Sequence, residues 1–425
     1  MVGGQSHLLK TKRFLPLLIT QFSIAFNDNF FRTALITLIT YRAYHLSEES
    51  KTLMVTIAIG IFMLPFFLFS TTGGQLANKY NKATLIRWIK FFEIVIMGLG
   101  SIGFVFGNIT FLLFVLFLMG TQSALFGPVK YSILPDHLAK NELIGANGFV
   151  EAGTFLSILL GTIFGSMVIA AGSDDITTVS ILIVAFAFFG FVSSLFIPDT
   201  EATQPEMKFT FNIFKETKNI ISITRRDENI FNAIIAISWF WLVGAIFLAQ
   251  IPNITSTLLH ASQGVFTLLL AIFSVGIGLG SLCCNTLLKG EISTKYVPIS
   301  SAIMALFMAD FTFTLSNFAP LWESSASVTT FASSFMGWRI IVDLLMISFF
   351  GGVYTVPLYT TLQSLSNDNE RSQVIAANNI ISALFMVLSS LIAMIILKYT
   401  ASIDTVFMVL TISHALMTAW LFYQD

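Results

Sequence analysis

Charged residues are scarce in this chain of 425 residues. Asp, Glu, Lys and Arg account for 11% of it, whereas hydrophobic residues account for 55% and the mean hydropathy is +0.83. Soluble domains carry about 25% charged residues. A water-soluble core cannot hide this much apolar surface, so lipid must be the solvent for most of the chain. The net charge of −1 gives no bulk attraction to nucleic acid, and we expect no nucleic-acid partner.

Cysteines and catalytic side-chain sets are equally sparse. The only cysteines are Cys283 and Cys284. Sequence neighbours rarely form a disulfide, and two thiols cannot complete a structural zinc site. None of the histidines is followed by an aspartate at the spacing of the His-x4-Asp signature of lipid acyltransferases, and no Ser/His/Asp set is evident. We therefore expect no enzyme, no metal and no cofactor.

What the chain does contain is a series of long apolar runs. A bilayer-spanning helix needs about 20 mostly apolar residues. By this criterion the sequence predicts an all-α membrane protein with twelve transmembrane helices, the first of them retained rather than cleaved as a signal. The predicted spans are 14–41, 53–72, 84–106, 109–132, 144–171, 178–197, 230–251, 264–288, 297–317, 336–361, 374–397 and 403–423.

Lysines and arginines alternate between the two predicted sides of the membrane. Lys10, Lys12 and Arg13 precede the first span, and further basic residues follow the second, fourth, sixth, eighth and tenth spans. The intervening connections hold few. By the positive-inside rule both termini are cytoplasmic, which also supports an even number of spans.

A long polar connection divides the spans into two sets of six. We predict an N-terminal six-helix bundle at 1–197, a cytoplasmic linker at 198–229 and a C-terminal six-helix bundle at 230–425. The linker contains a basic amphipathic pattern, which is typical of a helix lying on the inner leaflet. The apolar face of that helix consists of Ile213, Phe214, Thr217, Ile220 and Ile221.

The two halves also resemble each other in sequence. "GPVKY" (127–131) matches "VPLYT" (356–360), and "IGANG" (144–148) matches "IAANN" (375–379). Two six-helix bundles in parallel repeat are the arrangement expected of a major facilitator transporter.

The connection between the second and third spans supports this fold. "GGQLANKYNK" (73–82) resembles the inner-loop motif of that superfamily, in which cations grip helix ends and lipid phosphates at the cytoplasmic gate. Gly74, Lys79 and Lys82 fit the motif, whereas Asn78 stands where aspartate is usual. We predict gating or structural roles for these four residues.

Charges inside the membrane cost about 2.5–3.5 kcal/mol each even on lenient insertion scales, so each needs a reason. The first span contains Gln21, Asp28, Asn29 and Arg32. Asp28 and Arg32 lie four residues apart and share a helix face. Two interpretations remain open. The pair neutralises itself and holds the helix against a neighbour, or the cluster faces a cavity in which Asp28 takes a cationic group or a proton.

The fourth span ends in a helix breaker and a charge. Gly127 and Pro128 free backbone carbonyls and bend a helix, which is tolerated where protein or water lines the site. Lys130 either snorkels to the interface or is turned inward by this break. Glu151 of the fifth span is its candidate counter-ion, and Asn147 lies one turn below Glu151 on the same face.

The other intramembrane charges are interpreted chiefly as structural. Glu93 is expected to pair with a cation of its own or a neighbouring span. Arg339 and Asp343 form an i,i+4 pair that is either structural or an outer gate, and Asp310 is left unassigned. The second half offers milder cavity-side candidates, namely Gln250, Asn378 and Asn379.

Three stretches resemble the bacterial lysophospholipid transporter family, whose members are major facilitator proteins of the inner membrane. They are "AFNDN" (25–29), "FGPVKYSILP" (126–135) and "ANGFVEAGTFLSILLG" (146–161). The motif residues of the family fall on Asp28, Asn29, Pro128, Lys130, Tyr131, Glu151 and Ala152. With the neighbouring polar residues, the candidate substrate-binding set is Gln21, Asp28, Asn29, Arg32, Lys130, Tyr131, Asn147 and Glu151.

The resemblance implies that the chain flips lysophospholipids, chiefly lyso-phosphatidylethanolamine and lyso-phosphatidylglycerol, from the outer to the inner leaflet. An acyltransferase–acyl-ACP synthetase partner then reacylates them. We expect a monomer in the bacterial inner membrane, surrounded by membrane lipids. Two alternatives remain. One is a proton-coupled facilitator of another amphiphile, drug or metabolite that uses Asp28 as its proton site. The other is a membrane anchor of a lipid acyltransferase, although an anchor would not need inward charges or a duplicated fold.

Overall fold

The computed structural model describes residues 5–43, 47–170, 175–210, 212–317, 325–400 and 402–424. In these ranges the regular structure is helical, apart from one isolated bridge between Ala261 and Ala326. The long helices are α1 (Leu15–Arg42), α2 (Glu48–Lys79), α3 (Lys82–Phe106), α4 (Ile109–Ser132), α6 (Leu143–Ala170), α7 (Asp175–Ser194), α9 (Glu228–Asn253), α10 (Gln263–Leu288), α11 (Val297–Ser316), α13 (Phe335–Leu365), α14 (Arg371–Thr400) and α15 (Ile403–Gln424). The short ones are η1 (Gln5–Lys10), α5 (Leu134–His137), η2 (Lys140–Glu142), α8 (Ile213–Thr224), η3 (Ile254–Leu258) and α12 (Val328–Ser333).

Each predicted span falls on one of these long helices, with residue 171 outside the described ranges. Among the described residues, 11 helices are long and apolar enough to cross a membrane. The remaining long helix is α1, whose polar stretch around Asp28 and Arg32 lowers its hydropathy. Its neighbours α6 and α7 pack along it, so α1 lies within the bundle. The chain is therefore a multi-pass membrane protein, as its composition predicted.

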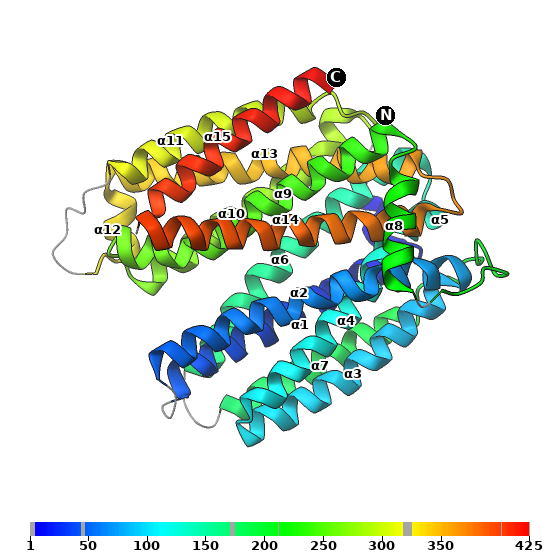
Figure 1. Cartoon of the computed structure of the whole chain (residues 1–425), viewed down its shortest axis with the longest axis horizontal. Coiled ribbons are helices and arrows are strands. Elements are labelled where there is room, and N and C mark those ends of the chain that lie inside the picture. Colours follow the sequence, from blue (N-terminus) through cyan, green and yellow to red (C-terminus); the bar gives the residue numbers. More distant parts are fainter. Residues whose placement is uncertain are drawn as a thin grey trace.

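The helices form two sets that lie one above the other in Figure 1. In the first set α1 packs on α6, α2 on α4 and α3 on α7, and in the second set α10 and α11 pack on α13 and α14 on α9. Two long contacts, α6 with α10 and α2 with α14, join the sets. The largest hydrophobic core cluster lies among these paired helices and contains apolar side chains of α1, α4, α6, α9, α10 and α13.

The two ends of the molecule carry different segments. η1, α8 and the last turn of α15 lie at one end, which we call the linker end. There Gln5 donates to the carbonyl of Asn141 at 2.6 Å, and Asn232 donates to Gln424 at 2.9 Å. The opposite, distal end carries α12 (Figure 1). A cytoplasmic location for the linker end remains a prediction from the basic residues.

Two glycines allow the two sets of helices to approach closely near the linker end. A Cβ on Gly74 of α2 would lie 3.1 Å from the Cβ of Ala376 on α14. A Cβ on Gly127 of α4 would lie 2.3 Å from the side-chain nitrogen of Asn379, which is also on α14. The helix α4 continues through Pro128 to Ser132. The Gly–Pro pair is therefore a point of close packing between the halves and does not end the helix.

The linker helix α8 lies across the junction of the two sets (Figure 1). Ile220 is buried against Phe67 of α2 and against Ala376, Ala377 and Ile380 of α14. Phe214, in contrast, is 90% exposed. The predicted single apolar face is therefore divided, because part of it packs against protein and Phe214 points outward.

Candidate functional site

A polar chain of side chains links α4, α6 and α1, and it begins in the last turn of α4. The ammonium of Lys130 donates to the hydroxyl of Thr154 at 3.1 Å. The Thr154 hydroxyl in turn lies 3.2 Å from the side-chain oxygen of Gln21. Lys130 also sits 4.8 Å above the ring of Tyr131. Lys130 is half-buried and turned into this network, so the prediction that it points inward agrees with the geometry.

The second half closes over this network through aromatic rings. Tyr131 of α4 stacks on Tyr359 of α13, with ring centroids 4.3 Å apart and planes 8° apart. The indole of Trp241 on α9 donates to the Tyr359 hydroxyl at 3.0 Å. On the first half, the Tyr131 hydroxyl donates to Glu151. A single stacked pair thus joins the buried acid of one half to the aromatic residues of the other.

Glu151 does not form the expected ion pair with Lys130. No ion pair within 4.0 Å joins the two in the described part of the chain, and Lys130 donates to Thr154. Glu151 is fully buried, and its Oε2 has no hydrogen-bond partner. The sequence placed the two residues at a similar depth correctly, but the rotation of α4 and α6 directs their charges to different partners.

Asp28 and Arg32 form a second polar level, closer to the distal end. The hydroxyl of Ser123 on α4 donates to Asp28 at 2.5 Å. Arg32 donates to Asn29 at 2.7 Å and stacks on Phe62 at 5.6 Å. Among the described residues, Asp28 and Arg32 make no direct ion pair and each donates to or accepts from another side chain. Both charged side chains remain half-exposed.

A sealed charge cluster anchors α1 beside this level. Glu93 of α3 accepts hydrogen bonds from Lys90 at 2.6 Å, Asn27 at 2.8 Å and Gln122 at 3.0 Å. Lys90 also donates to Ser23 at 3.0 Å. Lys90 and Asn27 have no exposed surface and Glu93 is 1% exposed. The cluster ties α1, α3 and α4 together, and it contains the expected pairing of Glu93 with a cation of its own span.

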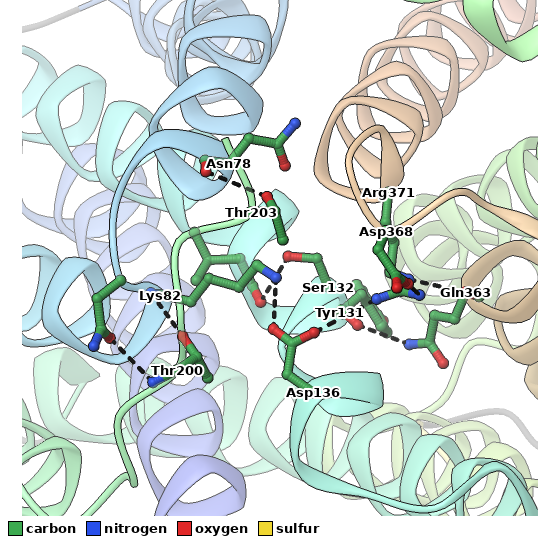
Figure 2. Close-up of polar contacts among 12 residues, drawn as sticks. Asn78, Lys82, Tyr131, Ser132, Asp136, Thr200, Thr203, Gln363, Asp368 and Arg371 are labelled. Carbon is green, nitrogen blue, oxygen red and sulfur yellow. Dashed lines mark hydrogen bonds and ion pairs between the residues drawn. The ribbon is translucent and has the colours of Figure 1, made fainter. Parts of the chain in front are cut away.

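The linker end carries a further ion cluster (Figure 2). Asp136 of α5 accepts from Lys82 at 2.6 Å and lies 3.5 Å from Arg371 of α14. Lys82 and Arg371 approach Asp136 from opposite sides, one from each half. Arg371 also pairs with Asp368 and donates to the carbonyl of Gln363 at 3.0 Å. Asp136 is therefore the shared anion of the two halves.

Amide side chains complete the contact at this end. Asn147 of α6 donates to Gln363 at 2.6 Å and to Thr360 at 3.1 Å, both on α13. Gln363 donates to the Tyr131 carbonyl at 3.1 Å. Asn78 donates to the carbonyl of Asn369 at 2.7 Å. The asparagine that replaces the usual motif acid is thus itself a contact between the halves.

The predicted pairing of Arg339 with Asp343 is wrong. Arg339 of α13 binds Asp310 of α11 through two hydrogen bonds instead. Asp343 is 1% exposed, and its Oδ2 has no hydrogen-bond partner. The i,i+4 spacing placed Arg339 and Asp343 on one face, but the acid that the sequence left unassigned is the better-placed partner.

The sequence did not identify Tyr359, Trp241 or Phe155 as residues of the site. The Phe155 ring stacks on Trp241 at 6.0 Å and contacts Phe240 and Phe273. The internal repeat carried a usable signal, because aligning Pro128 with Pro357 places Tyr359 opposite Lys130.

The site offers cations, acids and aromatic walls. No group of three or more potential metal ligands is found among the described residues. The residues can therefore bind and orient a molecule that carries opposite charges and an apolar part.

Comparisons with known proteins agree with this fold. The model of the Major Facilitator Superfamily matches residues 17–390. The lysophospholipid transporter LplT of Cronobacter sakazakii (strain ATCC BAA-894) is 25% identical over 364 residues, which cover 84% of this chain and 81% of that protein. LplT of Escherichia coli O1:K1 / APEC is 26% identical over 299 residues, covering 68% of this chain and 70% of that protein.

Solved structures show the same architecture. FucP, a major facilitator transporter in the outward conformation, superposes with a TM-score of 0.72 at 11% identity, over 98% of this chain and 100% of that chain. The predicted fold class is therefore confirmed. By its family match, its fold and its named relatives, this chain belongs to the Major Facilitator Superfamily and is a transporter rather than an enzyme.

Proposed function

We propose that this transporter moves lysophospholipids from the outer to the inner leaflet of the bacterial inner membrane. The observation that carries the proposal is the pairing of half-exposed intramembrane charges with an aromatic wall at the junction of the two halves. A charge at this depth is costly unless it serves a polar ligand. The names of the LplT relatives support the same substrate class.

The charged residues fit a phospholipid headgroup. Lys130 is a donor for the phosphate, with Arg32 as a second cation, and Asp28 is the acceptor for an ammonium. Asp28 bonds Ser123, which precedes Lys130 by seven residues of α4. Helical rise makes that separation about 10 Å, and an extended headgroup together with the lysine side chain bridges it. Glu151 is buried beneath Tyr131, so Asp28 is the better ammonium partner.

The acyl chain requires an apolar path. Phe155, Phe240 and Trp241 form an aromatic cluster, and the hydrogen bond from Trp241 to Tyr359 joins it to the Tyr131 stack. Such rings provide apolar area without a hydrogen-bonding demand on the chain. A single tail can lie against them, or extend between helices into lipid, while the headgroup stays on the charges.

Alternating access supplies the movement. The ion pair of Asp136 with Arg371 and the hydrogen bond from Asn147 to Gln363 join the two halves and, in this proposal, hold the linker end closed. Rocking of the halves would break these contacts and release the headgroup on that side. In this proposal the linker end and both termini are cytoplasmic, the transporter works as a monomer, and an acyltransferase partner consumes the product.

Flipping by the purified full chain in vesicles tests the proposal. Lyso-phosphatidylethanolamine with a fluorescent tail is added outside, and the fraction protected from extraction by albumin is followed. We expect protein-dependent protection for this lipid and for lyso-phosphatidylglycerol, and none for the diacyl lipid. Protection equal to that in protein-free vesicles for both lysolipids would refute the proposed substrate class.

A further inference from the structure

We propose that Asn378 binds the free glycerol hydroxyl of the substrate and thereby distinguishes lysophospholipids from lipids with two acyl chains. The inference rests on the proposed function and adds a residue of the second half that determines specificity. It is carried by the amide of Asn378, which is buried in α14 at the junction of the two halves and has no hydrogen-bond partner.

The side chain of Asn378 differs from the other buried amides that the structure describes. It is 1% exposed, and neither Oδ1 nor Nδ2 has a hydrogen-bond partner. Asn147, in contrast, exchanges hydrogen bonds with Gln363 in both directions. The Nδ2 atoms of Asn27 and Asn78 each donate to an acceptor. A buried amide with both atoms unpaired is unfavourable, so its presence here points to a ligand that pairs with it during transport.

Asn378 lies next to the aromatic pair that joins the halves. Its amide is a neighbour of the Tyr359 hydroxyl, although no hydrogen bond of normal geometry joins them. That hydroxyl instead accepts the indole N–H of Trp241 at 3.0 Å. The following residue, Asn379, is the one that a Cβ on Gly127 of α4 would meet. The helices α14 and α4 are therefore in close contact beside this amide.

The cation proposed for the lipid phosphate contacts the other ring of the same pair. The ammonium of Lys130 is 4.8 Å from the centroid of the Tyr131 ring, and that ring stacks on Tyr359 at 4.3 Å. A cation of the first half and an unpaired amide of the second half thus flank one stacked pair. Lys130 is half-buried, whereas Asn378 is sealed. A headgroup therefore reaches Lys130 first, and it reaches Asn378 when the stacked rings move apart.

A lysophospholipid carries groups that match both residues. Its glycerol has one free hydroxyl, close to the carbon that bears the phosphate. An amide has a donor and an acceptor, so Oδ1 of Asn378 can accept the hydroxyl proton while Nδ2 donates to an oxygen of the glycerol–phosphate linkage. Lys130 holds the phosphate itself. The molecule then binds both halves at once, which stabilises the conformation in which the rings have parted.

A lipid with two acyl chains cannot form the same contacts. The ester oxygen that replaces its hydroxyl has no proton to donate, so Oδ1 of Asn378 would stay unpaired. A site with a buried polar group for a substrate hydroxyl rejects an analogue without that hydroxyl more strongly than an apolar pocket rejects an added methylene. Asn378 therefore selects for the hydroxyl itself, independently of the bulk of a second chain.

The test separates the hydroxyl from the second chain. The full chain in vesicles is offered fluorescent lyso-phosphatidylethanolamine or its deoxy analogue, which has the same headgroup and single chain but hydrogen in place of the hydroxyl. The initial rates of protection from extraction by albumin are compared. Leaving the buried amide unpaired should slow the analogue about tenfold. Equal rates for the two lipids in the unchanged protein would overturn the inference and leave the proposed function intact.

A pair of variants assigns the effect to one side chain. Asn378→Leu keeps the approximate size of the side chain but removes both polar atoms, so it should move the two lipids at equal rates. The control is Asn285→Leu, which makes the same change at a buried amide of α10 whose Oδ1 also lacks a partner, and it should keep the preference for the hydroxyl. A preference that persists in Asn378→Leu would overturn the role of Asn378. Absence of any lysolipid movement by the unchanged protein would refute the proposed function itself.

Discussion

Replacing Asp136 with asparagine should open the linker end. The change removes the anion shared by Lys82 and Arg371 but keeps the size of the side chain. Lys82 is only 1% exposed, so in the closed state its ammonium would be left buried without a counter-ion. In the open state water solvates it. The substitution therefore destabilises the closed state selectively.

The structure sets the size of this effect. Removing one partner of a fully buried ion pair costs about 3–5 kcal/mol. Because the Asp136 side chain is 21% exposed, solvent screening reduces the expected cost to about 2 kcal/mol. That difference changes the ratio of open to closed molecules by a factor of about 30.

The accessibility of Thr360 reports the opening. Thr360 has no exposed surface and bonds Asn147 across the junction. A Thr360→Cys variant, made without Cys283 and Cys284, would be labelled with a water-soluble maleimide from the linker side. Asp136→Asn should raise the labelling rate at least tenfold. The control is Asp368→Asn, which removes the other acid partner of Arg371. The Asp368 side chain is 77% exposed, so this change should alter the labelling rate less than threefold. Equal labelling with and without Asp136 would show that the ion cluster does not hold the halves closed.

Three further predictions concern the interior. Lys130→Ala should reduce lysolipid uptake at least tenfold with normal membrane insertion. The control is Lys295→Ala, which removes another lysine stacked on its following tyrosine and should leave uptake unchanged. Unchanged uptake by the Lys130→Ala variant would remove Lys130 from the site. Glu93→Gln leaves the Lys90 ammonium buried without a counter-ion. The free energy of unfolding, measured by thermal unfolding in detergent, should therefore fall by about 3 kcal/mol. An unaltered melting temperature would contradict a structural role for Glu93. Gly127→Ala should weaken the contact between α4 and α14 and slow transport, because its Cβ would meet the side chain of Asn379. Adding Asn379→Ala to this variant should restore the contact and the transport rate. A normal transport rate in the single variant would show that α4 and α14 do not need this close approach.

The spans could be predicted because each depends on local composition. Twenty apolar residues in sequence identify a membrane helix whatever it packs against. Even α1 was found, although its hydropathy is reduced by its polar stretch. The buried Lys90–Glu93 contact could be anticipated for the same reason, since residues three apart share a helix face.

Contacts between helices were harder to predict. Arg339 was assigned to Asp343, but the rotation of α11 brings Asp310 closer. Lys130 and Glu151 lie at similar depth, yet their side chains point to different neighbours. Depth can be counted along a sequence, whereas the rotation of each helix about its axis depends on all of its neighbours. The internal repeat carried one usable signal, because aligning Pro128 with Pro357 places Tyr359 opposite Lys130.

The position of α8 has a mechanical consequence. Ile220 touches both α2 and α14, so a movement that separates these two helices must also break the packing of α8 against at least one of them. A flexible glycine–serine segment of equal length would keep the halves connected but would remove this packing contact. An antibody fragment that clamps α8 in place would, conversely, arrest the protein in its present shape without approaching the lipid path.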